Sequence, residues 1–409
     1  MNRLRSLCLM VPAVLMLSTP AGAQQLAYED VVRNLRNPDP EVRISAVRLL
    51  REAKYPEAIV PLAALVTDPV DDIQLEVIDA ELSHFLVREV PKKRKVAFVF
   101  EVRADGRAPR AFEMGPLAAW PMRAPPELVT ALLNAVDDEN GTVRLEAIHT
   151  LGVIGQGAIG EDHAKGLIAA LDHYDPAIRA AAARVIGRLR VGSAGDALIT
   201  AMNDSNDQVR YASMRALGEI GEPRAIKALT DQLTYYGKGE GAWSSLDALA
   251  RIAHPSSVEL FRSRLGDRDP FMRRAAAEGL GRTGYLSATE ALQDGATMDD
   301  SPMVRAAMAF ALYKHGQNYL GRLLDYLHID ATGRQVQGYL LEVGAAAVPA
   351  LLPGLLEPEE GARERLAEVL GAIGDASTIA ALTPLLQDRD RDVQRAATDA
   401  IARIKMRTE

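Results

Sequence analysis

The stretch that decides the fold reads Val209-Arg-Tyr-Ala-Ser-Met-Arg-Ala-Leu-Gly-Glu-Ile-Gly221, and near copies of it recur along the chain. One copy begins at Val143 and another at Met272. With the Arg of each copy as a reference position, the spacing between copies is between 28 and 35 residues, apart from one gap of 70. The reference positions are Arg43, Gln74, Arg144, Arg179, Arg210, Ala242, Arg273, Arg305, Gly333, Arg363 and Gln394. Self-similarity at a fixed period is the signature of a repeat architecture.

Each repeat contains two amphipathic helices. Apolar residues stand one position before the reference position and three, seven and ten positions after it, which is helical spacing. Residues such as Asp175 and Asn206 stand four positions before the reference position and are suited to cap the N-terminus of this helix. A second apolar helix lies upstream in each unit. One such pair cannot bury its apolar face alone, so the pairs must stack. The sequence therefore predicts an all-α fold, an α-solenoid of armadillo/HEAT-like superhelix type with about eleven helix-turn-helix repeats.

The motif Asp-x-x-x-x-Val-Arg-x-x-Ala-x-x-x-Leu-Gly resembles the short HEAT-type repeat of phycocyanobilin lyases, and the resemblance covers nearly all of residues 26–405. It implies a HEAT-like solenoid. It also implies a structural ladder between repeats, made of the turn Asp and the second-helix Arg. The residues it assigns to the ladder are Asp138, Arg144, Asp204, Arg210, Asp267, Arg273, Asp299 and Arg305.

The N-terminus has the pattern of a secretory signal peptide. Arg3 and Arg5 precede a short apolar stretch, and Ala21-x-Ala23 follows it, so cleavage after Ala23 is expected. The only cysteine, Cys8, lies inside this segment. We therefore expect an exported chain, periplasmic or secreted, with a signal peptide at 1–23 and repeats at 24–90 and 126–409. Loss of Arg3 and Arg5 changes the formal charge from −8 to −10, which argues against nucleic acid as a partner. No later apolar run is long enough to span a membrane.

Residues 91–125 interrupt the repeats. The segment is rich in proline and in aromatic residues, and the stretch from Val96 to Val102 is β-branched and aromatic, unlike any repeat helix. We expect a non-helical hairpin or loop here. Its aromatic residues Phe98, Phe100, Phe112 and Trp120 either pack on neighbouring repeats or bind a partner.

A second irregularity is the glycine-rich stretch from Tyr235 to Trp243, which occupies a turn where other repeats place their capping Asp. Tyr235, Tyr236 and Trp243 supply large amphipathic side chains of the kind enriched at binding hot spots. They form a second candidate for partner binding. Alternatively, they pack between repeats.

The second helix of each repeat carries polar residues five and nine positions after the reference position. By resemblance this helix lines the concave side. His149, Arg184, Arg188 and Arg215 would then form a basic patch that suits a carboxylate-rich peptide. The alternative is a solvated face of mixed charge.

The sequence predicts no cofactor and no metal site. Its seven histidines are dispersed, and the His-Glu pairs of the HEAT-like deoxyhypusine hydroxylases are absent. No nucleophile–base pair can be recognised from spacing. We therefore expect a chain that is not an enzyme, namely a non-catalytic scaffold that binds a protein or peptide on its concave face. The alternatives are a lyase-type HEAT enzyme or accessory, and a passive structural spacer.

Overall fold

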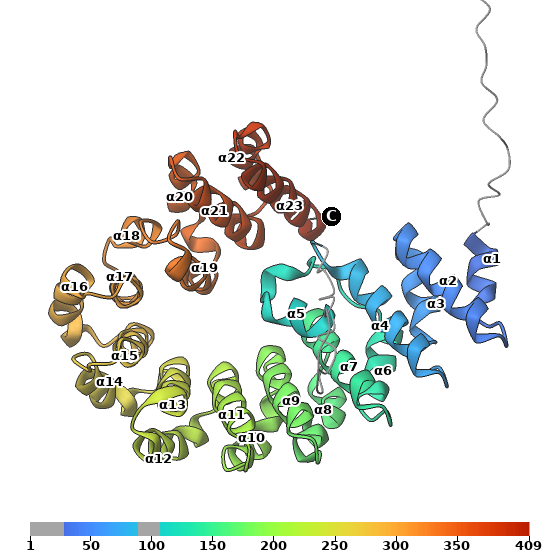
Figure 1. Cartoon of the computed structure of the whole chain (residues 1–409). Helices are drawn as coiled ribbons and strands as arrows, with labels where there is room; N and C mark the ends of the chain where they lie inside the picture. Colours follow the sequence, from blue (N-terminus) through green and yellow to red (C-terminus); the bar gives the residue numbers. More distant parts are fainter. Residues whose placement is uncertain (1–27, 89–106, 409) are drawn as a thin grey trace, which may run out of the picture.

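The computed structural model describes residues 28–88 and 107–408, and within them helices stack as successive pairs (Figure 1). The first helices of the pairs are α1 (Tyr28–Asn34), α3 (Ile59–Ala63), α6 (Pro126–Ala135), α8 (Lys165–Ala169), α10 (Gly195–Ala201), α12 (Ile226–Tyr236), α14 (Val258–Arg264), α16 (Thr289–Met298), α18 (Leu320–Leu324), α20 (Val348–Leu351) and α22 (Thr378–Leu382). The second helices are α2 (Pro40–Ala53), α4 (Asp71–Phe85), α7 (Gly141–Ile154), α9 (Pro176–Leu189), α11 (Asp207–Ile220), α13 (Gly239–Ile252), α15 (Pro270–Thr283), α17 (Pro302–Lys314), α19 (Asp330–Val343), α21 (Glu360–Ile373) and α23 (Arg391–Thr408). The predicted all-helical solenoid is confirmed.

Short 3-10 helices connect or extend most of these helices. They are η1 (Pro56–Ala58), η2 (Pro116–Ala118), η3 (Glu161–His163), η4 (Ala170–Asp172), η5 (Gly192–Ala194), η6 (Pro223–Ala225), η7 (Pro255–Ser257), η8 (Leu286–Ala288), η9 (Ala345–Ala347), η10 (Leu352–Leu356) and η11 (Thr383–Gln387). Most of them lie between the second helix of one pair and the first helix of the next, so they connect consecutive repeats within few residues.

The helix ends follow the local sequence. The side chain of Asp175 accepts a hydrogen bond of 2.9 Å from Ala177 N, and Pro176 occupies the first helical position of α9. The side chain of Asn206 caps α11 in the same way, accepting from Gln208 N at 2.9 Å. Gly221 ends α11 with φ +76°, a left-handed conformation that glycine adopts at little cost.

Small residues bring the second helices close together. A Cβ atom on Gly218 would lie 2.7 Å from the Cα of Ala248 in the next repeat, and one on Gly281 would lie 2.6 Å from the Cα of Ala311. No side chain fits in that space, so glycine here allows helix axes to approach closely. Many buried alanines on the same helices contribute to the same close packing.

An Arg–Asp ladder links consecutive repeats. Arg179 Nε pairs with Asp204 Oδ2 at 2.7 Å, and Arg273 Nε pairs with Asp299 Oδ2 at 2.8 Å, so each Arg binds the turn Asp of the following repeat. Asp138 accepts a hydrogen bond from Gln74 in the same manner. The remaining ladder residues named from sequence have other side-chain partners. Three arginines contact a ring of the following repeat: Arg144 contacts His173, Arg210 donates to the Tyr236 hydroxyl at 2.6 Å, and Arg305 donates to the Tyr326 hydroxyl at 3.1 Å. Asp267 pairs with Arg264 at 3.1 Å.

The stacked pairs curve until the C-terminal helix α23 lies next to residues 86–88, which follow α4, and residues 115–120, which follow α5 (Arg107–Glu113) (Figure 1). From α7 to α21 the second helices line the inside of the curve, and the first helices form its outer side. Helices α1 to α3 lie beyond the meeting point.

Polar contacts connect the two sides of this meeting point. Arg403 of α23 donates hydrogen bonds to Ala119 O at 2.7 Å and to Leu117 O at 2.9 Å. Its guanidinium also lies 5.8 Å from the centre of the Trp120 ring. Arg88, just after α4, pairs with Glu368 at 3.3 Å and with Asp399 at 3.4 Å. The solenoid is therefore closed into a ring by side chains that are far apart in sequence.

The insertion departs from the expected hairpin or loop in its described part. Residues 107–113 form helix α5, in which Pro109 lies in the first turn, where a missing N–H breaks no helical bond. The chain then returns along the end of α4, where Val87 N donates to Ala118 O at 2.9 Å and Trp120 N donates to Phe85 O at 2.7 Å. The expected signal peptide 1–23 and the candidate residues Phe98 and Phe100 lie outside the described residues.

Across residues 28–88 and 107–408, no single helix is both long and apolar enough to cross a membrane. Within the described residues, one bent pair, α19 together with Ala345–Leu356 at a bend of 99°, meets both requirements by length and composition.

Candidate functional site

The inner face of the ring carries a connected set of charged side chains on α13, α15 and α19. Asp247 on α13 accepts from Arg251 at 3.1 Å and pairs with Arg274 of α15 at 3.2 Å. Glu278 of α15, only 3 % exposed, pairs with Arg282 at 3.1 Å. We call these five residues, together with Tyr339 and Glu342 of α19, the inner network.

The network joins helices that are two repeats apart. The Tyr339 hydroxyl donates to Glu278 Oε1 at 2.6 Å, and Arg282 Nη2 lies 2.9 Å from Glu342 Oε2. Helices of alternate repeats in a straight stack would be about 20 Å apart, because packed neighbours are separated by 8–10 Å. Only the concave side of a strongly curved stack brings such side chains into contact, so the inner network lies inside the ring.

Burial and opposite charges together set the ionisation of the network. Burial alone would raise the pKa of Asp247, but Arg251, Arg274 and Arg282 lower that pKa to about 2. Burial, and then Glu278, raise the pKa of Tyr339 well above its usual value. Asp247 is therefore ionised and Tyr339 protonated at neutral pH. The network presents a fixed pattern of charge and hydrogen-bonding groups.

The predicted basic patch is only partly formed. Arg184 of α9 is exposed, and Arg215 of α11 is exposed and pairs with Glu240 at 2.7 Å. Arg188 instead donates to Phe112 O at 2.6 Å and its guanidinium lies 3.6 Å from the centre of the Phe112 ring. His149 does not join an exposed patch, because it is only 5 % exposed and burial lowers its pKa to about 4.

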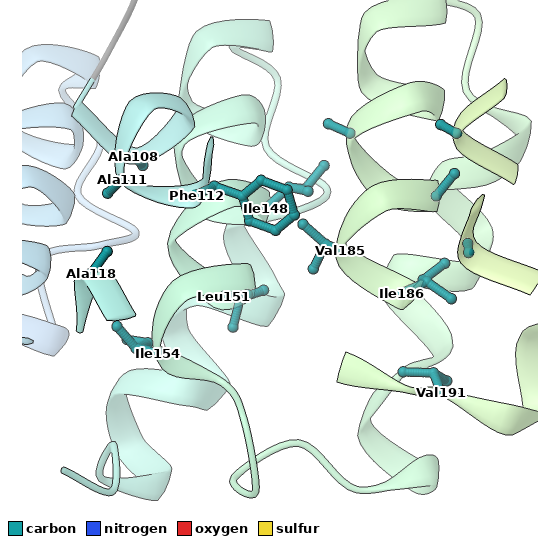
Figure 2. Close-up of a cluster of buried hydrophobic side chains, with 14 of the residues drawn as sticks. Ala108, Ala111, Phe112, Ala118, Ile148, Leu151, Ile154, Val185, Ile186 and Val191 are labelled. Atoms are coloured by element: carbon teal, nitrogen blue, oxygen red, sulfur yellow. The ribbon is translucent and has the colours of Figure 1, made fainter. Parts of the chain in front are cut away.

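The burial of His149 is caused by the insertion. Phe112 of α5 points between α7 and α9, close to Ile148 and Val185 (Figure 2). A Cβ atom on Gly152 would lie 2.5 Å from the Phe112 ring, so this glycine provides the space the ring occupies. The ring meets the His149 ring edge-on at 5.7 Å. Phe112 is thus a packing residue between repeats.

The stretch from Tyr235 to Trp243, expected to be a turn, is non-helical only at residues 237–238, because Tyr235 and Tyr236 end α12 and Trp243 lies in α13. Its aromatic residues are partly packed and partly exposed. Tyr236 accepts from Arg210, and Trp243 donates from its indole N–H to Asp269 Oδ2 at 2.6 Å and stacks on Phe271. Tyr235 is 80 % exposed. Partner binding by this turn therefore stays a prediction that rests mainly on Tyr235.

Four residues of the inner network stand in the polar columns five and nine positions after the reference position, namely Asp247, Arg251, Glu278 and Arg282. Sequence reasoning missed Arg274, Tyr339 and Glu342 and the residues of the ring closure. Tyr339 occupies a position where the other repeats mostly carry Ala, Gly or Val, and that departure could have marked it. Arg88 and Arg403 offered no such signal. In the described part of the chain, no group of three or more His, Cys, Asp or Glu side chains could hold a metal ion.

Comparison with known families gives a match to a family of HEAT repeats over residues 164–235, 240–313 and 348–409. Among curated proteins, the chain is 29% identical over 172 residues to the bilin biosynthesis protein PecF of Nostoc sp. (strain PCC 7120), covering 38% of this chain and 98% of that protein. It is 26% identical to the uncharacterized phycocyanin operon protein Z of Pseudanabaena tenuis, covering 38% of this chain and 80% of that protein. It is 34% identical to the phycobilisome maturation protein of Synechococcus elongatus, covering 30% of this chain and 60% of that protein.

Among solved structures, an engineered protein has a TM-score of 0.40 at 19% identity, covering 92% of this chain and 98% of its own. The complex of CpcE and CpcF of phycocyanin lyase from Nostoc sp. PCC7120 has a TM-score of 0.35 at 20% identity, covering 75% of this chain and 96% of that chain. Because both TM-scores are below 0.5, neither similarity supports a conclusion about the function of this chain.

The relatives correct one expectation from the sequence. We expected a chain that is not an enzyme, but the proteins it resembles include a bilin biosynthesis protein and a phycobilisome maturation protein, so this expectation is contradicted. Absence of a recognisable nucleophile–base pair was a poor guide, because repeat proteins build sites from side chains far apart in sequence.

Proposed function

We propose that this chain, which belongs to the HEAT repeat family, is a lyase-type HEAT protein that holds a protein client against the inner face of its ring. The observation that carries the proposal is the similarity to the bilin biosynthesis protein, since it extends over 98% of that relative. The chain would work as a subunit or an accessory of a lyase, by binding and orienting its client.

The geometry of the inner face supports binding of a client. The side chains of the inner network are held by mutual contacts, so little rotamer entropy is lost when a charged partner binds them. Arg184 and Arg215 lie on α9 and α11, the second helices of the two repeats that precede α13, and both are exposed. Exposed guanidiniums on a concave surface suit carboxylates on a client.

The expected signal peptide leads to a proposal about location. Bilin attachment takes place in the cytoplasm or a plastid, so an exported lyase-type protein would serve a different client. Export predicts that the mature protein begins at Gln24. Mass spectrometry of the protein purified from its source tests this, and an intact N-terminus at Met1 would contradict export.

In-cell crosslinking with mass spectrometry tests the client proposal. The wild type is compared with an Arg184→Glu, Arg215→Glu variant and with a control, Lys227→Glu, which reverses an exposed charge on the outer helix α12. We expect one dominant partner whose crosslinks map to the inner helices, lost in the double variant and kept in the control. Crosslinks on the outer helices, or equal capture by all three proteins, would overturn the proposal.

A further inference from the structure

A cavity lies where the ring closes. Its volume is about 640 Å³, and it is bounded by the end of α7 and the residues after it, by residues 115–123, and by α23. Phe85, Ile154 and Trp120 contribute apolar walls. This volume falls in the range of ligand pockets for small molecules.

The charge of this closure cavity is unbalanced. Its lining includes Arg123, Arg188, Arg403 and Arg407 and, among the described residues, no Asp or Glu. Arg403 and Arg188 use their hydrogen bonds on backbone carbonyls, as described above. Arg407 does the same, donating to Gly371 O and Gly374 O, each at 2.6 Å. A carbonyl satisfies a guanidinium N–H but leaves its charge uncompensated.

Nearby acidic side chains offset only part of this positive charge, and Glu219 acts on Arg188 alone among the four arginines. The acidic groups that act on Arg403 are Asp399 and Glu368, and Arg88 already pairs with both. Burial, followed by the charge of Arg407, lowers the pKa of Arg403. Arg123 is exposed at the mouth of the cavity. An anion that entered would therefore meet several cations in a partly desolvated space, where the attraction is stronger than in water.

We propose that the closure cavity binds a small organic anion, a molecule with an aromatic or aliphatic body and at least one carboxylate. The carboxylate lies among the guanidiniums of Arg123, Arg403 and Arg407, since planar guanidiniums match carboxylates in geometry. The apolar body lies against Trp120 and Phe85. The site is separate from the inner network and does not rest on the proposed client.

Fluorescence titration tests the proposal with a defined probe, 11-(dansylamino)undecanoic acid, and with its methyl ester as the neutral counterpart. We expect saturable binding of the acid by the full chain, with one site per molecule, and binding of the ester weaker by about tenfold or more, because charge-assisted hydrogen bonds are lost. The acid should also bind less tightly at high salt.

Two kinds of variant locate the site. Arg123→Gln, Arg407→Gln removes two cations while keeping side-chain donors, and should weaken binding of the acid but not of the ester. Val153→Trp fills the cavity without touching the arginines, and should abolish binding of both probes. Val60→Trp, at an exposed valine on α3, is its matched control.

The titrations of the wild type and the variants either support or overturn the proposed anion site. No saturable binding, or equal binding of acid and ester by the wild type, overturns the proposal. Unchanged binding in Val153→Trp also overturns it, even if the arginine variant unfolds. Loss in Val153→Trp together with retention in Val60→Trp supports the cavity as the site.

Discussion

Replacement of Arg403 by Ala should open the ring. The guanidinium of Arg403 donates to Ala119 O and Leu117 O, and the side chain is only 8 % exposed. Hydrogen bonds to a charged group contribute about 1.5 to 3 kcal/mol each, so the variant should lose roughly 3 kcal/mol or more of closure free energy. A loss of this size shifts the equilibrium between closed and open rings by about 100-fold.

The second closing contact is too weak to compensate. Arg88 is 32% exposed in its side chain, and its partners Glu368 and Asp399 are 26% and 22% exposed. Pairs with this much solvent access typically contribute about 1 kcal/mol or less. The open state should therefore be populated in Arg403→Ala, whereas the wild type stays closed.

Distances between spin labels measure this opening. Labels at Met114→Cys and Lys405→Cys, with Cys8→Ser, place one probe on each side of the closure at exposed positions. The wild type should give one narrow distance distribution and Arg403→Ala a broad one that extends to longer distances. Arg395→Ala on the same helix is the control, because Arg395 pairs only within α23. Identical narrow distributions in Arg403→Ala and in an Arg88→Ala, Arg403→Ala variant would refute the reasoning.

Three further predictions concern buried polar groups. Glu81 is fully buried, and neither carboxyl oxygen has a hydrogen-bond partner among residues 28–88 and 107–408. Burial raises the pKa of Glu81, so Glu81→Leu should stabilise the fold by about 1 to 3 kcal/mol. Because the folded state holds the proton more tightly, the wild type loses stability as pH rises above the unfolded pKa, and urea denaturation should show a larger gain at pH 7 than at pH 4. Tyr339→Phe should cost about 1.5 to 3 kcal/mol, since buried Glu278 loses a donor; an unchanged melting temperature would contradict this. His149 should titrate near pH 4 by NMR, and its contribution to stability should be lost as pH falls from about 6.5 toward 4, because the unfolded chain binds the proton more readily; an apparent pKa near 6.5 would show that its ring is not buried.

Features that depend on neighbours in sequence could be predicted. Asp175 and Pro176 begin α9 because a carboxylate and a proline satisfy the first turn locally. The Arg179–Asp204 pair recurs because each repeat meets the next in nearly the same way. Even Glu81 could have been recognised, because it occupies a column in which the other repeats carry only Leu or Ile.

Features that depend on how all the repeats add up could not be predicted from the sequence. Each stacking step adds a small rotation, and no single repeat records how far eleven of them turn. The contact of Arg403 with Leu117 and Ala119 exists only because the accumulated curvature returns α23 to the insertion.

The same reason applies to the candidate sites. The repeat pattern alone determined the helices and their caps, and the resemblance to HEAT-type repeats added the ladder and the helix of each pair that lines the concave side. Tertiary structure decided that Phe112 covers His149, that Tyr339 reaches Glu278 across two repeats, and that four arginines surround one cavity. Local rules act between residues within a repeat or its neighbour, whereas curvature brings together side chains from repeats that the sequence keeps apart.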